Sequence, residues 1–302
     1  MSSRTVEQGE LTAESANRAL RAAGVQVGLA TEGAQLIRLG SNAVFRVPGY
    51  VIARVARSAD MFDNAKKQVD VASWLEANGI PAVRALDLQQ PVIADHRVVT
   101  FWHSESDQEM YAEIGDVAEL IRRLHELDEP ADIQLPRLQP FGRSGDPVPD
   151  FPGLSNEDSD YLRGRFADAR DSFDSLDYAL PRGVVHGDAN VGNVILADDG
   201  RPVLIDLDSF SIGPREWDLI QTAIFYDRFG WHSAEEYETF VRVYGYDIIG
   251  WSEYPKLADL REVAMTAWLS RKAVNSDKSA AEAAKRINTM RTGASRRDWS
   301  AY

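Results

Sequence analysis

The chain has 302 residues, 44% of them hydrophobic, which is enough for one large domain or for two lobes that share a cleft. Its net charge of −14 at pH 7 excludes nucleic acid and anionic membranes as partners and favours a cationic ligand, although the same charge can serve solubility alone. The absence of cysteine excludes disulfides, thiolate metal sites and a cysteine nucleophile. The N-terminus is polar, which predicts that there is no signal peptide, and no run of about 18 apolar residues occurs in the sequence, which predicts that there is no membrane span. We therefore expect a cytoplasmic protein.

The first hundred residues predict a helix, three strands, a second helix and a hairpin. Thr12 can cap a helix that Gly24 ends, because glycine commonly stops helices. Turn residues such as Pro48-Gly49 then separate short apolar runs that are typical of strands. Strands are predicted at 36–39, 43–47 and 50–55, a helix at 61–77, and a hairpin from 92–93 and 98–101 around Asp95-His96.

After Trp102 a polar stretch at 104–109 indicates a linker, and the rest of the chain is mostly helical. We therefore expect an α+β protein with a small antiparallel-sheet lobe over residues 1–103 and a larger, mostly helical lobe over 104–302. Helical patterns begin at Tyr111 and recur at 157–176, 217–229, 234–244, 257–272 and 280–290, with a proline-rich loop at 140–152 and a hairpin from 194–196 and 203–205.

Three side chains carry the pattern that indicates chemistry. Asp188 is followed five residues later by Asn193, and the predicted hairpin returns the chain to Asp206. Phosphoryl transfer needs a carboxylate to accept the hydroxyl proton and a few oxygen ligands for Mg²⁺, and this order and spacing match the catalytic loop of protein kinases. Asp and Asn also favour ordinary turns, so the loop alone would be weak support, and the hairpin that ends at Asp206 strengthens it.

The sequence resembles the aminoglycoside phosphotransferase family from roughly Leu36 to Tyr244. The motifs that carry the resemblance are His186-Gly187-Asp188 with Asn193, the strand end Ile205-Asp206, the segment Leu124-His125-Glu126-Leu127, and a Gly213-Pro214 turn before a helix opened by Asp218.

The resemblance implies a protein-kinase-like fold in which the small lobe binds nucleotide and the large lobe is catalytic and binds substrate. It implies that Asp188 is the catalytic base and that Asn193 and Asp206 bind Mg²⁺. Asp218 and His186 would give the catalytic loop structural support.

The small lobe departs from the kinase pattern. A strand lysine normally grips the nucleotide phosphates and pairs with a helix glutamate, and the corresponding positions here are Arg54 and Gln68. Arginine can grip phosphate bidentately, so we expect Arg54 to do so, with Arg57 as the alternative if the register slips.

Two further segments complete the expected nucleotide site. Gly40 and Ser41 would form a short phosphate-covering turn, or else a plain hairpin turn. Thr100, Phe101 and Trp102 lie where the two lobes would join. By resemblance the backbone of these three residues would meet the adenine edge, although both aromatic residues can equally belong to the core.

The substrate wall is expected in the segment that begins after Asp206, where acids alternate with aromatic residues. Such a mixture suits a polyhydroxylated cation through ion pairs and cation–π contacts, or else it is a solvated charged face. The candidate residues are Asp208, Glu216, Tyr226, Asp227, Trp231 and Glu235.

The sequence therefore predicts an ATP- or GTP-dependent, Mg²⁺-dependent phosphotransferase that acts on a hydroxyl of a small molecule. The leading substrate is an aminoglycoside or related cationic antibiotic, which would make the protein a resistance enzyme. A metabolite kinase acting on an amino alcohol or sugar is one alternative, and a catalytically silent kinase-like binding protein is another. The sequence gives no information on the oligomeric state.

Overall fold

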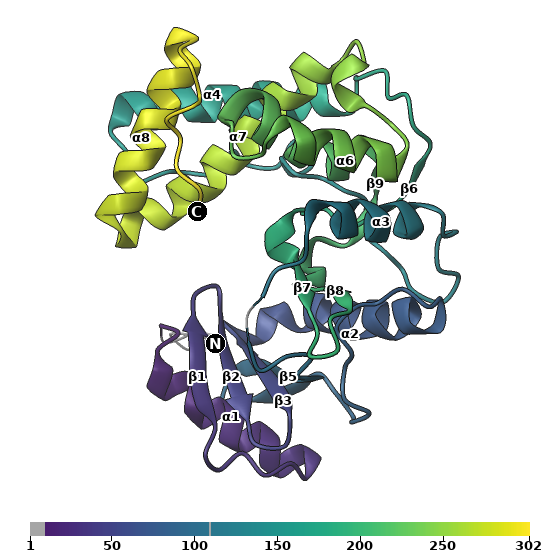
Figure 1. Cartoon of the computed structure of the whole chain (residues 1–302). Helices are drawn as coiled ribbons and strands as arrows, with labels where there is room; N and C mark the ends of the chain where they lie inside the picture. The colour runs from purple at the N-terminus through teal and green to yellow at the C-terminus, as the bar shows by residue number, and fades with distance from the viewer. Residues whose placement is uncertain (1–9, 109) are drawn as a thin grey trace. The chain divides into compact units, whose positions relative to one another are not determined.

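The computed structural model describes residues 10–108 and 110–302 (Figure 1). The chain folds into two compact units. The first comprises residues up to Ala112 with Pro130–Leu135 and Val191–Phe210, and the second comprises Glu113–Glu129, Pro136–Asn190 and Ser211–Tyr302.

The hairpin at 194–204 belongs to the first unit because its backbone is hydrogen-bonded there. Leu204 donates to the Pro81 carbonyl and accepts from Val83, and Ala112 donates to the Val194 carbonyl. From the sequence we expected this hairpin in the larger lobe. The backbone hydrogen bonds that place it in the first unit join residues far apart in the chain, so they leave no local signal in the sequence. The predicted division of roles between residues 1–103 and 104–302 stays a prediction.

The first unit is built on a five-stranded antiparallel sheet of order β1-β2-β3-β5-β4. Its elements are α1 (Ala13–Val27), β1 (Gln35–Leu39), β2 (Asn42–Val47), β3 (Val51–Ala56), η1 (Ala59–Met61), α2 (Phe62–Ala77), β4 (Val92–Ala94), β5 (Arg97–His103), η2 (Val191–Asn193), β7 (Val194–Leu196), β8 (Pro202–Leu204) and η3 (Leu207–Ser209).

Alternation along β2 and β3 sets the core of this unit. Every second residue of each strand is buried, as expected when one face of a sheet is covered. The covering element is α1, whose Ala16, Leu20 and Ala23 join the same hydrophobic cluster as Phe45 and Phe101. Arg54 belongs to the opposite face of β3, which leaves its side chain available for polar contacts.

The predicted end of the first helix is wrong. Gly24 does not stop α1, which continues to Val27 and is capped by Gly28 at a φ of 73°. Gly24 is buried inside the helix, where an added Cβ would lie 2.6 Å from the Leu29 carbonyl oxygen. The glycine is therefore required by a close approach of the following chain rather than by helix termination.

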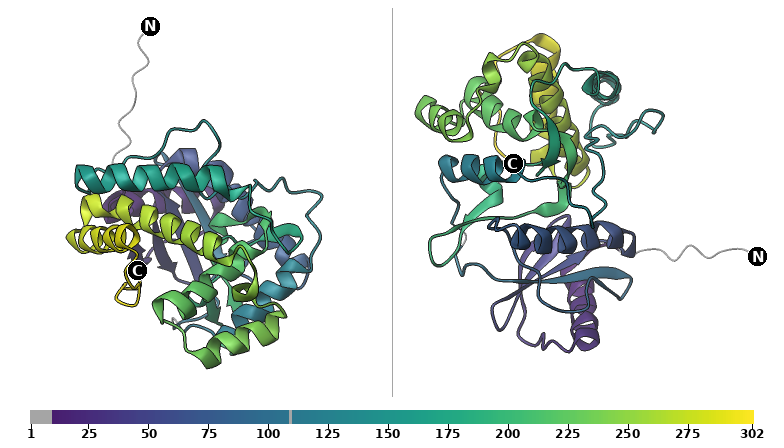
Figure 2. Two further views of the ribbon diagram at one scale, coloured as in Figure 1. Left: turned by 90° about the horizontal axis from the view of Figure 1, so that it is seen from above. Right: turned by 90° about the vertical axis from the view of Figure 1, so that its right-hand side faces the viewer.

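The second unit is mostly helical (Figure 2). Its packed helix pairs include α3 with α6, α4 with α7, α5 with α7, and α7 with α8. Its elements are α3 (Ile114–His125), α4 (Asn156–Phe173), β6 (Arg182–Val185), β9 (Ser211–Pro214), α5 (Glu216–Ile224), the π-helix η4 (Phe225–Phe229), α6 (Ala234–Tyr244), η5 (Ile248–Gly250), α7 (Tyr254–Lys272), η6 (Ala273–Asn275) and α8 (Asp277–Thr292).

Two features of this unit position the site. The two-stranded pair β6–β9 was not predicted, and the expected turn at Gly213-Pro214 is the end of β9, paired with Arg182 and Gly183. The second feature is α5, all nine residues of which are buried. The first turn of α5 contacts the chain after β6 through Asp218, which accepts hydrogen bonds from His186 and Gly187. The predicted α+β class is confirmed.

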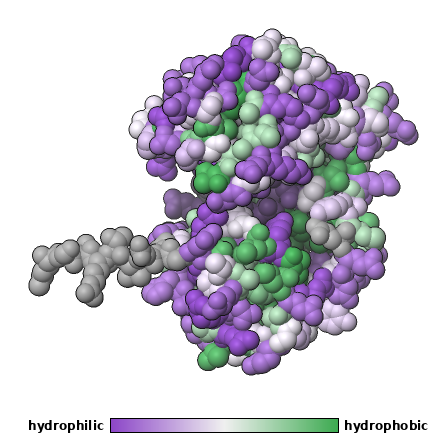
Figure 3. Space-filling model, turned by 90° about the vertical axis from the view of Figure 1, so that its left-hand side faces the viewer, coloured by the Kyte–Doolittle hydropathy of each residue, from purple (hydrophilic) through white to green (hydrophobic). Residues whose placement is uncertain are grey.

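Hydrophilic residues cover much of the face shown in Figure 3 and hydrophobic patches interrupt them. Some exposed apolar side chains come from the edge strand β1, where Leu36, Ile37 and Leu39 are all exposed. Among the described residues, no helix is long and apolar enough to cross a membrane.

Candidate active site

The loop after β6 is held by a buried carboxylate. Asp218, in the first turn of α5, is fully buried, and its two oxygens accept backbone hydrogen bonds from His186 at 2.7 Å and from Gly187 at 2.8 Å. Gly187 has a φ of 85°, a left-handed conformation that suits glycine. The loop is thereby fixed immediately before Asp188.

His125 from α3 completes the anchor. Its Nε2 lies 3.1 Å from Asp218 Oδ2, and because a carboxylate only accepts, Nε2 carries the hydrogen. Burial alone would raise the pKa of Asp218. The hydrogen bond and charge of His125, with contributions from His186, outweigh burial and lower that pKa below its ordinary value. Asp218 therefore remains an ionised anchor for the loop, and the buried His186 is part of the same packing.

Asp188 is partly exposed and is contacted by an arginine that the sequence analysis missed. Arg261, in α7, donates from Nη2 to Asp188 Oδ1 at 2.8 Å and to the Gln221 side-chain oxygen. Its guanidinium lies 4.7 Å from the ring centre of Trp217, whose Nε1 donates to the Gly187 carbonyl. Arg261 belongs to no motif, so only the tertiary structure could identify it.

In the first unit the hairpin β7–β8 brings Asn193 and the segment of Asp206 together. Asn193 directly precedes β7, and its carbonyl oxygen accepts from Ile205 N at 2.9 Å. Asp206 has φ 60° and ψ 64°, a left-handed conformation that is uncommon for residues other than glycine and often marks functional sites. Its side chain is 40% exposed, so its oxygens are accessible.

Arg54 contacts its predicted partner Gln68 and also Asp206. Its Nη1 donates to Gln68 Oε1 at 3.0 Å, and its Nη2 lies 3.4 Å from Asp206 Oδ1. The predicted counterparts of the kinase lysine and glutamate, an arginine and a glutamine, are thus in direct contact. Phosphate binding by Arg54 stays a prediction.

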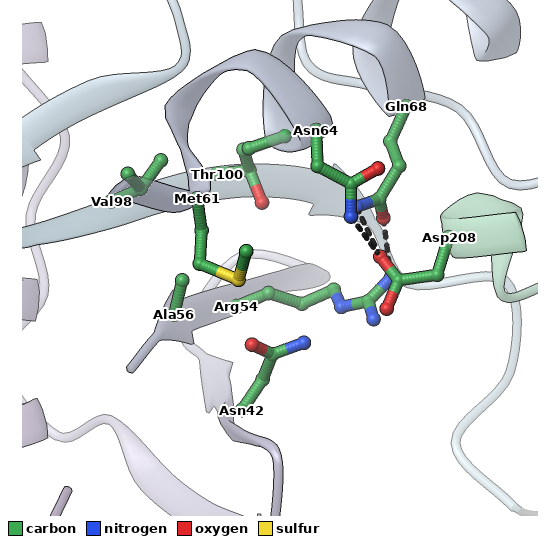
Figure 4. Close-up of a pocket in the computed structure, with 10 residues that line it drawn as sticks. Asn42, Arg54, Ala56, Met61, Asn64, Gln68, Val98, Thr100 and Asp208 are labelled. Carbon is green, nitrogen blue, oxygen red and sulfur yellow. Dashed lines mark hydrogen bonds between the residues drawn. The ribbon is translucent and has the colours of Figure 1, made fainter. Parts of the chain in front are cut away.

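Asp208, which was predicted to belong to the substrate wall, is held by α2, and its role in substrate binding stays a prediction. Its carboxylate Oδ1 accepts from Asn64 at 3.1 Å and from Gln68 at 2.5 Å, as Figure 4 shows. Its backbone oxygen accepts from Lys67 Nζ at 2.6 Å. These three donors come from α2, so Asp208 is engaged by the protein itself.

The segment expected to meet the adenine edge lies in β5. The side chains of Phe101 and Trp102 are buried in the core of the first unit. Phe101 N donates to the Gln90 side chain at 2.7 Å, and its carbonyl oxygen accepts from Leu86 at 3.0 Å. Contact between the backbone of this segment and a nucleobase stays a prediction.

The remaining residues of the expected nucleotide site lie elsewhere on the same sheet. Thr100 accepts from Trp102 Nε1 at 2.8 Å and lines the same pocket as Arg54. Gly40 and Ser41 are exposed in the β1–β2 turn, where Gly40 N donates to the Asn42 carbonyl oxygen. A phosphate-covering role for this turn stays a prediction.

Among the second-unit candidates for substrate binding, Glu216 is a correction, because it is fully buried. Its side chain is fully buried and accepts from Leu180 N at 2.7 Å. Burial raises the pKa of Glu216, although that backbone hydrogen bond opposes the change. A core carboxyl group that is already hydrogen-bonded to the backbone cannot form part of an open substrate wall.

The other four candidates are closer to the surface and differ in their contacts. Asp227 accepts from Tyr254 Oη at 2.9 Å, and Tyr226 stacks on Tyr237 with ring centres 4.8 Å apart. Trp231 donates to the Trp299 carbonyl at 3.1 Å. Glu235 is exposed in the first turn of α6. Their role in substrate binding stays a prediction.

The side-chain oxygens of Asp206 and Asn193 are donors that fit a hard divalent ion whose other ligands are phosphate and water. Asp206 offers a carboxylate and Asn193 an amide oxygen, the donor types that Mg²⁺ prefers when phosphates and water supply the rest. Among residues 10–108 and 110–302, no three His, Cys, Asp or Glu side chains form a group that could hold a metal.

The α+β fold described above is shared with kinase-like phosphotransferases of known structure. The sequence model of the phosphotransferase enzyme family matches residues 35–260, and the chain belongs to that family. The predicted resemblance to aminoglycoside phosphotransferases is confirmed.

Solved structures support the same fold at low sequence identity. An amicoumacin kinase in complex with AMP-PNP and Ca²⁺ is 12% identical with a TM-score of 0.66, covering 90% of this chain and 91% of that one. An aminoglycoside phosphotransferase from Streptomyces rimosus is 21% identical with a TM-score of 0.60, covering 82% and 96%. A choline/ethanolamine kinase family protein from Mesorhizobium loti is 17% identical with a TM-score of 0.57, covering 87% and 88%. No curated protein matches the chain significantly.

Proposed function

We propose that the protein transfers the terminal phosphoryl group of ATP or GTP to a hydroxyl group of a small molecule. The observation that carries this proposal is the buried Asp218 carboxylate, which holds the backbone of His186 and Gly187 and so fixes the chain leading to Asp188. A general base must lie close to the proton that it accepts, so fixing the chain beside Asp188 favours proton transfer.

In this proposal Asp188 accepts the proton of the substrate hydroxyl. The hydroxyl oxygen forms a bond to the terminal phosphorus while the bond to the bridging oxygen of the nucleotide breaks, and the nucleoside diphosphate leaves. Asn193 and Asp206 would hold Mg²⁺, which when bound neutralises phosphate charge. Arg54 would contact the phosphates from the sheet.

We propose a hydroxylated amine as the substrate class, with an aminoglycoside or related cationic antibiotic as the leading candidate. Three observations support it: the net charge of −14, neighbours solved with spectinomycin, streptomycin or kanamycin, and a neighbour from the choline/ethanolamine kinase family. The last keeps an amino alcohol as the second candidate. Both candidates share a hydroxyl acceptor and a positive charge.

The test is Asp188→Asn, assayed for turnover and for nucleotide binding with Mg²⁺ after a panel of hydroxylated amines has identified a substrate. Turnover should fall about 10²–10⁴-fold, the usual contribution of a general base, while nucleotide binding persists. Asp171→Asn makes the same change at an exposed position of α4 and should leave turnover unchanged. Wild-type turnover in Asp188→Asn would refute the assignment, and a wild-type protein that binds nucleotide without turnover would indicate a silent kinase-like fold.

A further inference from the structure

Gln68 lies between a cation and an anion and contacts both. Its Oε1 accepts from Arg54 Nη1 at 3.0 Å, and its Nε2 donates to Asp208 Oδ1 at 2.5 Å. The side chain is buried, only 7% exposed, and Figure 4 shows it reaching the Asp208 carboxylate beside Asn64. One amide group thus links Arg54 of β3 to Asp208 of η3.

This bridge depends on the chemistry of the amide. Arginine can only donate hydrogen bonds and an ionised carboxylate can only accept them, so a residue between them must accept on one side and donate on the other. Glutamine does both. A glutamate at this position would satisfy Arg54 but would set a second carboxylate against Asp208, and like charges at hydrogen-bond distance repel strongly when buried.

The rest of α2 holds Asp208 in the same place. Asn64 Nδ2 donates to Asp208 Oδ1 at 3.1 Å. Lys67 Nζ donates to the backbone oxygens of Asp208 at 2.6 Å and Phe210 at 3.2 Å. Burial lowers the pKa of Lys67, and the nearby Asp208 charge opposes that change. Three side chains of one helix therefore fix the segment that begins at Asp206.

We propose that in this protein the negative charge of the kinase-type ion pair has moved from α2 to Asp208, and that Gln68 must stay neutral to position Arg54 for the triphosphate. The second part rests on the proposed function, in which Arg54 contacts the phosphates. Gln68 and Asp208 are positioning residues, since they act through Arg54. Restoring the usual kinase glutamate should accordingly impair the protein.

The experiment compares the full-length protein with Gln68→Glu, with Asp208→Asn, and with the double variant. In the double variant the charge sits at position 68 and the amide at position 208, so the new amide can donate to the new carboxylate and still accept from Asn64. Two quantities are measured for each: the Kd of ATP and GTP with Mg²⁺, and the free energy of unfolding without nucleotide. The wild type, the two single variants and the double variant form a double-mutant cycle for each of these quantities.

Gln68→Glu should weaken triphosphate binding about tenfold, which corresponds to about 1.4 kcal/mol, and should lower the free energy of unfolding. The double variant should recover most of both losses. Gln89→Glu makes the identical change at an exposed loop position of the same unit and should alter neither quantity.

A Gln68→Glu variant that binds triphosphate as tightly as wild type would overturn the proposal, as would a double variant no better than Gln68→Glu. If the wild-type protein binds neither triphosphate, the proposed function fails together with the phosphate role of Arg54. The unfolding cycle then still shows whether the Gln68–Asp208 pairing exists: recovery in the double variant supports it and simple additivity rejects it.

Discussion

Arg261 is the residue in direct contact with the candidate base. It donates to one oxygen of Asp188, and it is itself held by Gln221 and by the face of Trp217. This contact orients the Asp188 carboxylate. Arg261 is only 7% exposed, so this contact is sheltered from the solvent that weakens ion pairs at a surface.

We expect Arg261→Met to lower turnover by up to about 10²-fold, because small misplacements of a catalytic group have effects of this size. The KM for nucleotide should change little. Arg261→Lys keeps the charge and should recover part of the loss. Steady-state kinetics with both substrates varied would separate these effects.

The matched control is Arg228→Met. Arg228 is also mostly buried in the second unit, but its partners are Asp259 and Glu262. This variant should be less stable yet turn over normally per folded molecule. Equal loss of turnover in both variants would mean that Arg261 supports the fold and does not position Asp188.

At the scale of elements, the first turn of α5 anchors the loop after β6. The pKa of Asp218 is lower in the folded protein than its ordinary value of 3.8. Its ionised form is therefore favoured by folding, and the stabilisation is fully present above the unfolded pKa and is lost as the pH falls through the folded pKa.

Asp218→Asn should lower the free energy of unfolding at neutral pH by about 3 kcal/mol, since it breaks a buried charged network. The gap between wild type and variant should stay constant from about pH 5 to 8 and should shrink below about pH 4. Denaturant titrations at several pH values measure this gap. Asp171→Asn should show no gap at any pH, and a gap for Asp218→Asn that widens towards acid pH would contradict the assigned pKa direction.

Local patterns predicted the elements that form from neighbouring residues. The hairpins β4–β5 and β7–β8 have short turns that are visible in the sequence, and α6 was predicted to the residue. The pair β6–β9 joins segments far apart in the chain, so no local sequence pattern indicated this pairing. Gly24 was misjudged because its role depends on Leu29 and Thr31 packed against it.

The same limit applies to the candidate site. The spacing of Asp188, Asn193 and Asp206 was visible, and so was the Arg54–Gln68 pairing, because these follow a recurring linear pattern. Burial was not visible. Glu216 and Asp208 carry the same charge as open substrate-binding acids, and only their tertiary partners, Leu180 and α2, show that they are engaged internally.

At the scale of the whole molecule, the net charge of −14 bears on the substrate. Attraction between exposed charges is screened over about 8 Å at physiological ionic strength. If the substrate is a hydroxylated amine, added salt should weaken its binding, whereas a neutral sugar should be unaffected.

We expect the KM of the amine substrate to rise several-fold between roughly 0.05 and 0.5 M salt, with nucleotide saturating. A neutral hydroxylated compound that also turns over serves as the control. A salt-independent KM for a cationic substrate, or a neutral best substrate, would reject the cationic class. The proposed phosphoryl transfer does not depend on that outcome.

The complete burial of α5 also determines how slowly its backbone amides exchange with solvent. Hydrogen exchange at a backbone amide requires that the amide meet water, and in a helix with no exposed residue this needs large-scale unfolding of its surroundings. The amides of α5 should therefore be among the slowest to exchange, and those of the exposed edge strand β1 among the fastest. The loop that ends at Asp188 is thus tied, through Asp218, to a helix that loosens only when the unit around it does.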